Sequence, residues 1–203
     1  MKTQQKKLTR SFYTRNVLTV AKELLGKIFV KVENGNKILS GYIVEVEAYK
    51  GKVDQAAHSY KGKTKRNEVM FEEGGHLYVY FTYGVHFCAN VVTGKKNEGD
   101  AVLIRAIEPV EGLNLMAERR FGKTELNEKE KINLTNGPAK ICQAFNLGRK
   151  ENGEDLTGGK IYLLDRPKIP TKEIIKTKRI GIKKSTGLLW RFYIKNNSYI
   201  SKR

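Results

Sequence analysis

Residues 76–91, HLYVYFTYGVHFCANV, contain more aromatic side chains than one buried face of a sheet can hold. The run is typical of a β-hairpin, and its turn is expected near Tyr83. Because side chains alternate along a strand, Tyr78 and Tyr80 are expected on one face and Phe81 and Tyr83 on the other. Some of these rings must therefore have a task other than core packing.

The position of each ring in the hairpin suggests that task. We expect Tyr78, Phe81 and Phe87 to pack as in an ordinary strand pair. Tyr83 lies at the turn, where a large ring has no core to pack against. Exposed rings beside many lysines are typical of nucleic-acid-binding proteins, in which they stack on bases or enter between base steps.

The charge of the chain favours the same class of partner. Lys and Arg number 39 against 21 Asp and Glu, which gives a net charge of +18. A polyanion is the natural partner, because neutralising phosphates releases counterions. The alternative is a general bias of the sequence toward lysine. The length of 203 residues and a hydrophobic content of 39% predict one domain over residues 1–203, with residues 1–10 as a flexible basic leader.

Cysteine and histidine are too sparse for a metal site or a disulfide framework. Cys88 and Cys142 are far apart, and no CxxC motif or zinc-ligand spacing occurs. The sequence has no run of about 18 apolar residues, no signal-peptide core and no phosphate-binding glycine loop. We therefore expect a cytoplasmic protein with no membrane partner, no metal and no cofactor.

The periodicity of the chain predicts helices and strands in an α+β arrangement. A helix is expected between Asn16 and Gly26, and two more at 113–121 and 138–147, with Pro138 in a first turn. Strands are expected at the ranges 27–33, 38–49, 76–91, 101–109, 160–165 and 188–194. These elements predict a single domain with a largely antiparallel sheet. Residues 50–75 form a connection long enough to suggest a function.

The strand IVEVEAY carries two acidic residues in its middle. Alternation is expected to place Ile43, Glu45, Glu47 and Tyr49 on one face. An edge strand with an acidic face toward solvent would explain this pattern. Against that alternative stands Arg105, which lies among apolar residues in AVLIRAIE and needs an anionic partner.

A carboxylate beside an arginine has two possible uses. In a cleft of a basic protein, it is suited to deprotonate water as a general base. A structural ion pair is the other reading, and the residues alone leave both open. Tyr49, His58 and Tyr80 could enclose a flipped base, and Asn90 could hydrogen-bond a base edge. The run KGKTKRN, residues 61–67, is either a phosphate-contacting loop or a flexible one.

Several separated blocks of the sequence resemble the alkyladenine (3-methyladenine) DNA glycosylase family. Over residues 41–112 the blocks are EVEAYKGKVDQAAHS, RN, MFEEGGHLYVYFTYGVHFCANV and AVLIRAIEPVEG. The similarity extends through NGPAKICQA, RIGI and WRFYI. The resemblance implies an α+β domain with a curved sheet flanked by helices and a protruding β-hairpin that enters the DNA minor groove.

The resemblance also implies roles for individual residues. Glu47 matches the general base that activates water, and Arg105 matches the arginine that helps to hold this water. The carbonyl of Ile180 matches a further protein group that contacts the water. The rings of Tyr49, His58 and Tyr80 are implied to enclose the extruded base, and the main chain at Ala56 and His58 to contact its edge. Asn90 is implied to exclude guanine by crowding its exocyclic amine. Tyr83 is implied to intercalate into the duplex where the base has left.

The expected function is therefore a monofunctional DNA glycosylase. It would excise alkylated and also deaminated purines from double-stranded DNA, act as a monomer in base excision repair, and need neither a cofactor nor an obligatory protein partner. One alternative is a non-catalytic nucleic-acid-binding protein in which Glu47 and Arg105 form a structural pair. A second alternative is a bifunctional glycosylase and lyase that uses a lysine. A bacterial protein of this kind would be associated with the nucleoid.

Overall fold

The computed structural model describes residues 6–82 and 84–202. In this part of the chain, eight strands form one sheet with the path β3-β4-β5-β2-β1-β6, while β8 pairs with both β2 and β7. The strand bounds are β1 Ile28–Val32, β2 Ile38–Tyr49, β3 Leu77–Thr82, β4 His86–Thr93, β5 Asp100–Glu111, β6 Ile161–Leu164, β7 Ile174–Thr177 and β8 Arg191–Ile194. Every pairing between them is antiparallel, which confirms the predicted class.

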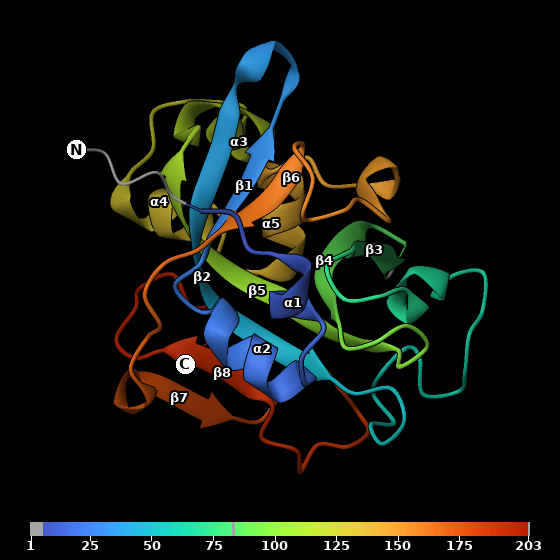
Figure 1. Ribbon diagram of the computed structural model, residues 1–203. Coiled ribbons are helices and arrows are strands. Elements are labelled where there is room, and N and C mark those ends of the chain that lie inside the picture. Colours follow the sequence, from blue (N-terminus) through green and yellow to red (C-terminus); the bar gives the residue numbers. More distant parts are fainter. Residues whose placement is uncertain (1–5, 83, 203) are drawn as a thin grey trace.

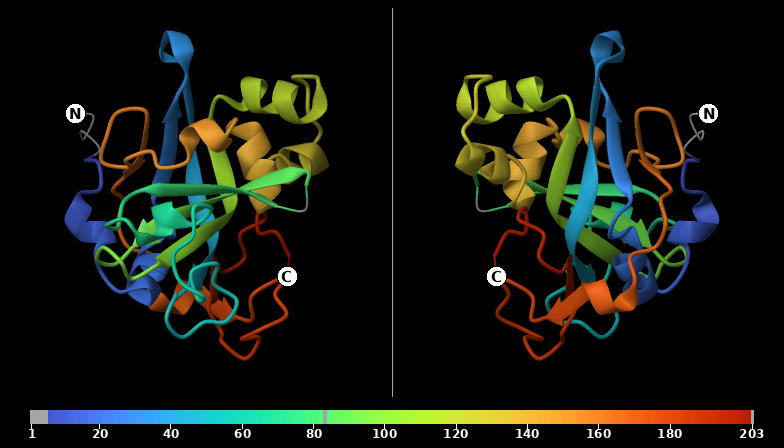
Figure 2. Two further views of the ribbon diagram at one scale, coloured as in Figure 1. Left: turned by 90° about the vertical axis from the view of Figure 1, so that its right-hand side faces the viewer. Right: turned by 90° about the vertical axis from the view of Figure 1, so that its left-hand side faces the viewer.

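Helices cover both sides of this sheet. The helices are α1 Arg10–Tyr13, α2 Val17–Leu24, α3 Leu113–Phe121, α4 Glu128–Asn133 and α5 Pro138–Ala144. One-turn 3-10 helices occur at Asn34–Asn36, Glu68–Phe71, Arg149–Glu151 and Thr171–Glu173. Figure 2 shows α1 and α2 on one side of the sheet and α3, α4 and α5 on the other. In Figure 1, the end of the β1–β2 pair projects from the top of the molecule.

The helix boundaries follow the capping signals in the sequence. The Asn16 side chain accepts a hydrogen bond from the Leu18 N–H at 2.9 Å, and Gly26 adopts φ +79° after α2 ends. Pro138 occupies the start of α5. The N–H groups of a first helical turn have no partner within the helix, so the lack of an N–H in proline costs no hydrogen bond there. The predicted helices at these places are confirmed, with α5 ending at Ala144.

Strand β2 lies in the interior of the sheet. It pairs with β5 from Ser40 to Tyr49, with β1 from Ile38 to Tyr42, and with β8 from Glu45 to Glu47. Glu45 and Glu47 are both fully buried. The alternative of an edge strand with an acidic face toward solvent is therefore wrong.

The expected placement of Ile43 on the same face as these acids is also wrong. The register between β2 and β5 shifts between Ile43 and Glu45. Such a bulge changes the alternation of side chains along the strand. Ile43 therefore joins Val46 and Ala48 in the hydrophobic core, while Glu45 and Glu47 are buried among polar partners.

The β3–β4 hairpin has the register Tyr78↔Asn90 and Thr82↔His86. Tyr78 is buried, as expected, but Phe81 is 38% exposed and contacts Phe87 at a ring-centroid distance of 4.9 Å. Phe81 thus packs on Phe87 within the strand pair, as expected, but it is not buried, because β4 pairs with β5 only from Asn90 onward and the distal part of the hairpin has no neighbouring strand among the described residues. Tyr83, the expected intercalating ring, lies outside the described residues.

The residues that we expected to form a flexible leader include an ordered part. The Leu8 side chain is buried, and its N–H donates to the Leu163 carbonyl at 2.8 Å. Arg10 begins α1 and pairs with Asp155 at 2.6 Å. Residues 7 and 8 thus pair with β6, while Arg10 is held by Asp155. Of the helices in the described ranges, none is long and apolar enough to span a membrane.

Candidate active site

A cavity of about 520 Å³ opens where the ends of several strands meet two loops. Its walls come from β2, β3, β4 and β5, from the loop at 55–58, from the start of α5 and from residues 180–184. Its size is in the range of small-molecule sites. The structure gathers seven of the residues singled out in the sequence around it, namely Tyr49, Ala56, His58, Tyr80, Asn90, Arg105 and Ile180.

Glu47 lies directly behind this wall and is held by three of its members. One carboxylate oxygen, Oε1, accepts a hydrogen bond from the Ile180 N–H at 2.7 Å and lies 3.4 Å from Nη1 of Arg105. The other oxygen, Oε2, accepts a hydrogen bond from the Tyr49 hydroxyl at 2.8 Å. A fully buried carboxylate needs such donors, because desolvation of an unpaired charge is costly. Glu47 is therefore fixed in place and adjoins the groups that line the cavity.

Arg105 connects the cavity with a second carboxylate. Its Nε donates to Oε1 of Glu45 at 3.2 Å, while its Nη1 faces Glu47. Arg105 is 8% exposed and lines the cavity. The prediction that this arginine has a strand carboxylate as its partner is confirmed, and the structure supplies two of them.

Aromatic rings from β3 and from the 55–58 loop form one side of the cavity. The ring centroids of His58 and Tyr80 are 4.4 Å apart at an interplanar angle of 76°. Tyr78 stacks on Tyr80 at 5.4 Å, and its hydroxyl lies 3.1 Å from Nδ1 of His58. Tyr78 was expected only to pack, so its hydrogen bond to His58 is a contribution that alternation could not reveal.

Burial controls the charge of these rings. Desolvation lowers the pKa of His58, with a further contribution from the nearby Arg66, so the imidazole is neutral at neutral pH. Desolvation also raises the pKa of Tyr78 to about 12 and raises the pKa of Tyr80 and Tyr49 further. These rings along the cavity are thus uncharged at neutral pH.

The polar groups around the rings are largely engaged within the protein. The buried Asn90 side chain donates from Nδ2 to the Tyr78 carbonyl at 3.2 Å. The Ala56 N–H donates to Oδ1 of Asp54, and the His58 carbonyl accepts a hydrogen bond from Asn67. These contacts hold the 55–58 loop and the Asn90 side chain in place.

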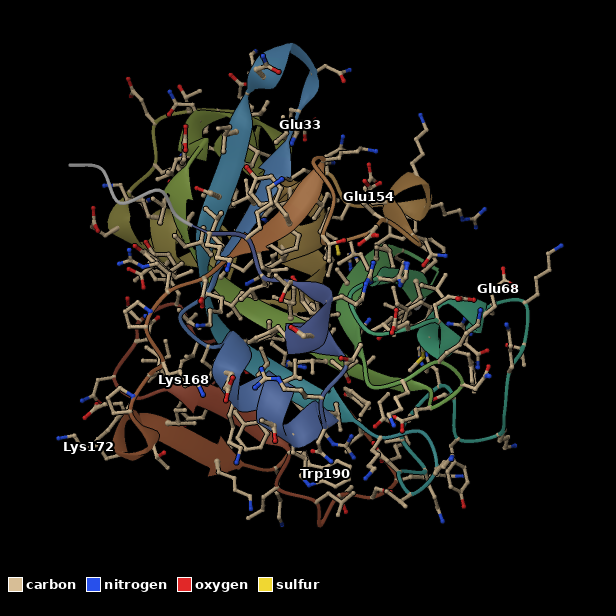
Figure 3. All side chains as sticks on the ribbon, viewed as in Figure 1. Glu33, Glu68, Glu154, Lys168, Lys172 and Trp190 are labelled. Atoms are coloured by element: carbon tan, nitrogen blue, oxygen red, sulfur yellow. The ribbon has the colours of Figure 1, made fainter. Side chains whose placement is uncertain are left out.

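A buried ion pair that the sequence did not indicate adjoins two of the segments that line the cavity, because Asp54 precedes Gln55 and Arg179 precedes Ile180. Arg179 and Asp54 make two hydrogen bonds of 2.5 and 2.8 Å, and both side chains are fully buried. The guanidinium of Arg179 lies 4.5 Å from the ring centroid of Tyr49 and 5.5 Å from that of Trp190, which is labelled in Figure 3. Both residues lie in blocks that carry the resemblance, but nothing in the sequence indicated that they pair with each other.

The mouth of the cavity carries positive charge. Lys183 and Lys184 line it from the loop that follows Ile180. Arg66, from the 61–67 loop, donates to the Phe81 carbonyl at 3.1 Å and so docks that loop on the hairpin. Within residues 6–82 and 84–202, no group of three or more His, Cys, Asp or Glu side chains has an arrangement that could hold a metal ion.

Comparison with known proteins gives consistent similarities. A sequence profile of the family described as "Methylpurine-DNA glycosylase (MPG)" matches residues 11–198, which include every segment that lines the cavity. A Clostridium novyi (strain NT) protein named "Putative 3-methyladenine DNA glycosylase" is 50% identical over 204 residues, covering 98% of this chain and 100% of the relative.

Two further proteins with the same printed name come from other bacteria. The one from Carboxydothermus hydrogenoformans is 51% identical over 197 residues and covers 97% of this chain and 99% of the relative. The one from Clostridium acetobutylicum is 47% identical over 201 residues and covers 96% and 97%. The similarity therefore spans almost the whole length of both chains in each comparison.

Proposed function

Because the chain belongs to the methylpurine-DNA glycosylase family, we propose that it is a monofunctional DNA glycosylase for alkylated purines of the 3-methyladenine type. The observation that carries this proposal is a cavity walled by aromatic rings and backed by a buried carboxylate in contact with Arg105, Tyr49 and the Ile180 amide. An aromatic cavity suits a purine, and a fixed carboxylate behind it suits the activation of water.

Recognition of the damaged base rests on the rings. Alkylation of a ring nitrogen gives the purine a positive charge, and the faces of Tyr49 and Tyr80 attract such a cation. His58 is neutral and adds no repulsion to this charge. Asn90 is held against the Tyr78 carbonyl and would crowd the exocyclic amine of guanine. Tyr83 would fill the gap that the extruded nucleotide leaves in the duplex.

The chemical step is the hydrolysis of the glycosidic bond. A water oxygen forms a bond to the anomeric carbon, its proton passes to Glu47, and the bond from the sugar to the base nitrogen breaks. The electron pair of that bond moves to the cationic base, which leaves as a neutral molecule. Arg105 and the backbone of Ile180 would hold the water between Glu47 and the sugar. General-base assistance of this kind accelerates a reaction about 10²- to 10⁴-fold.

The substrate range and the setting are part of the same proposal. Deaminated purines are a second candidate substrate class; such a base is uncharged before cleavage, so it would take up a proton from water as it leaves. The partner is double-stranded DNA, in the cytoplasm and on the nucleoid, and the enzyme acts as a monomer of one domain without a cofactor. The net charge of +18 supports binding to a phosphate backbone.

Release of free base from lesion-containing duplexes tests the function. The protein is incubated with duplexes that carry 3-methyladenine, 7-methylguanine, hypoxanthine or ethenoadenine, and the released base is measured by chromatography. We expect free methylated base and an intact abasic strand. Binding without release would support a non-catalytic binding protein instead. A covalent adduct trapped by borohydride would support a glycosylase and lyase that uses a lysine.

A further inference from the structure

A second layer of buried charge lies behind Glu47 and Arg105. Glu45 is fully buried, and its Oε1 accepts hydrogen bonds from the Nε atoms of Arg105 at 3.2 Å and of Arg191 at 2.7 Å. Arg191 lies on β8 directly opposite Glu47 in the strand pairing. The two carboxylates, of Glu45 and Glu47, therefore balance the charge of the two arginines, Arg105 and Arg191. Of these four side chains, Arg105 alone is among the described residues that line the cavity.

The C-terminal end of the chain completes this cluster. Ser201 donates twice to Glu45, from its N–H to Oε2 at 2.5 Å and from its hydroxyl to Oε1 at 2.9 Å. The Lys202 carbonyl accepts a hydrogen bond from Nη2 of Arg191. Both tail residues lie beyond residues 11–198, the part of the chain that the family profile matches. The tail thus adds contacts to the cluster from outside the matched range.

These contacts determine the orientation of one guanidinium. Arginine presents its donors in a rigid plane, so fixing one edge of the plane fixes the direction of the others. Glu45 holds Nε of Arg105, and the Ser201 hydroxyl lies 3.5 Å from its Nη2. The remaining terminal nitrogen, Nη1, then lies 3.4 Å from Glu47. A change at Ser201 or Glu45 would let the plane rotate away from this position without touching the cavity.

We propose that Ser201 and Glu45 are positioning residues that aim Arg105 at Glu47. This inference rests on the proposed function, because it assigns Arg105 a part in holding the water that Glu47 activates. Neither residue lines the cavity among the described residues, so their substitution should leave DNA binding unchanged and affect the chemical step.

The matched test uses two serines three residues apart. Ser201→Ala removes the hydroxyl donor, and Ser198→Ala, at an exposed serine on the same tail, is the control. We expect Ser201→Ala to slow single-turnover base release about tenfold, on the scale of a hydrogen bond to a charged group. Affinity for an abasic duplex should stay as in the wild type. Ser201→Thr, which keeps the hydroxyl, should restore the rate, and Ser198→Ala should leave it unchanged.

A spectroscopic measurement separates positioning from a general loss of structure. The side-chain Nε–H signal of Arg105, assigned in ¹⁵N NMR spectra by its absence in Arg105→Lys, should move in Ser201→Ala and stay in Ser198→Ala. Glu45→Gln provides the second variant, and it should move the same signal and slow release at unchanged affinity.

The outcomes distinguish this inference from the proposed function. If the wild-type protein releases no base from any duplex, the proposed function fails. If the wild type is active while Ser201→Ala matches Ser198→Ala in rate and in the Arg105 signal, the positioning inference alone fails. Loss of affinity with an unchanged rate, or no rescue by Ser201→Thr, would also overturn it.

Discussion

Tyr49 contacts two buried arginine–carboxylate systems, Glu47–Arg105 through its hydroxyl and Asp54–Arg179 through its ring, and the two differ in their access to the cavity. The pair Asp54–Arg179 is closed, since two hydrogen bonds join the partners and both side chains are fully buried. The Glu47–Arg105 contact is longer, at 3.4 Å, and Arg105 lines the cavity. Neither Asp54 nor Arg179 is among the described residues that line it.

This difference shows why buried charge alone does not indicate catalysis. A buried ion pair often contributes little net stability, yet removing one partner is strongly destabilising because the other charge is left unpaired. In the closed pair, which does not itself line the cavity, the main consequence of a substitution should therefore appear in folding. Arg105 of the Glu47–Arg105 contact lines the cavity, so part of the effect of a substitution in that contact should appear in the rate of the reaction in the cavity.

Asp54→Asn should give the largest loss of stability, because it leaves the Arg179 guanidinium buried without a counter-charge. We expect the free energy of unfolding to fall by about 3–5 kcal/mol, a decrease of roughly 10 °C in Tm for a chain of this size. Calorimetry and denaturant titration measure the loss. A variant as stable as the wild type would show that this pair is not the closed structural element described above.

Asp100→Asn tests a buried carboxylate that has no arginine. Asp100 is 5% exposed, accepts a hydrogen bond from the Gly51 N–H at 2.9 Å, and forms no ion pair with any described residue. Burial raises the pKa of Asp100 from its ordinary 3.8 to about 6. Because the folded-state pKa is the higher one, the stability that Asp100 contributes is present below about pH 4 and is lost as the pH rises through 6.

Asparagine keeps the acceptor and cannot ionise. Asp100→Asn should therefore stabilise the protein by about 1–3 kcal/mol at pH 7 and much less at pH 4.5. The difference in Tm between variant and wild type, measured at both values of pH, checks this expectation. An equal difference at both would mean that Asp100 does not titrate in this window.

Tyr49→Phe sharpens the comparison at the boundary between the two systems. It removes the hydroxyl that donates to Oε2 of Glu47 and keeps the ring that lies over Arg179. We expect base release to slow by about tenfold, with a change of at most about 1 kcal/mol in stability. Single-turnover kinetics measure the rate of base release, and a thermal melt measures the stability. A large loss of stability at an unchanged rate would show that this hydroxyl has a structural role, like the Asp54–Arg179 pair.

The sequence was sufficient to predict much of the sheet and the composition of the cavity. Alternation and turn signals located every strand except β7, and the resemblance indicated the residues that surround the cavity. What alternation could not predict was the bulge after Ile43, because a register shift depends on the partner strand. The exposure of Phe81 likewise depends on where β4 stops pairing with β5.

The long-range partners were beyond any local signal. Arg179 is 125 residues from Asp54, and Ser201 is 156 residues from Glu45. A charged residue in a loop has the same local sequence pattern whether it pairs across the fold or faces water. Only the fold of the whole chain decides between these outcomes. The contacts of Arg179 with Asp54 and of Ser201 with Glu45 could therefore be identified only from the structure.

The most direct test of the account is single-turnover base release by Glu47→Gln. Glutamine keeps the size of the side chain and an acceptor but cannot take a proton from water. We expect release from an alkylated duplex to fall by about 10²- to 10⁴-fold while affinity for an abasic duplex stays within a few-fold of the wild type. A folded Glu47→Gln protein that releases base at the wild-type rate would contradict it.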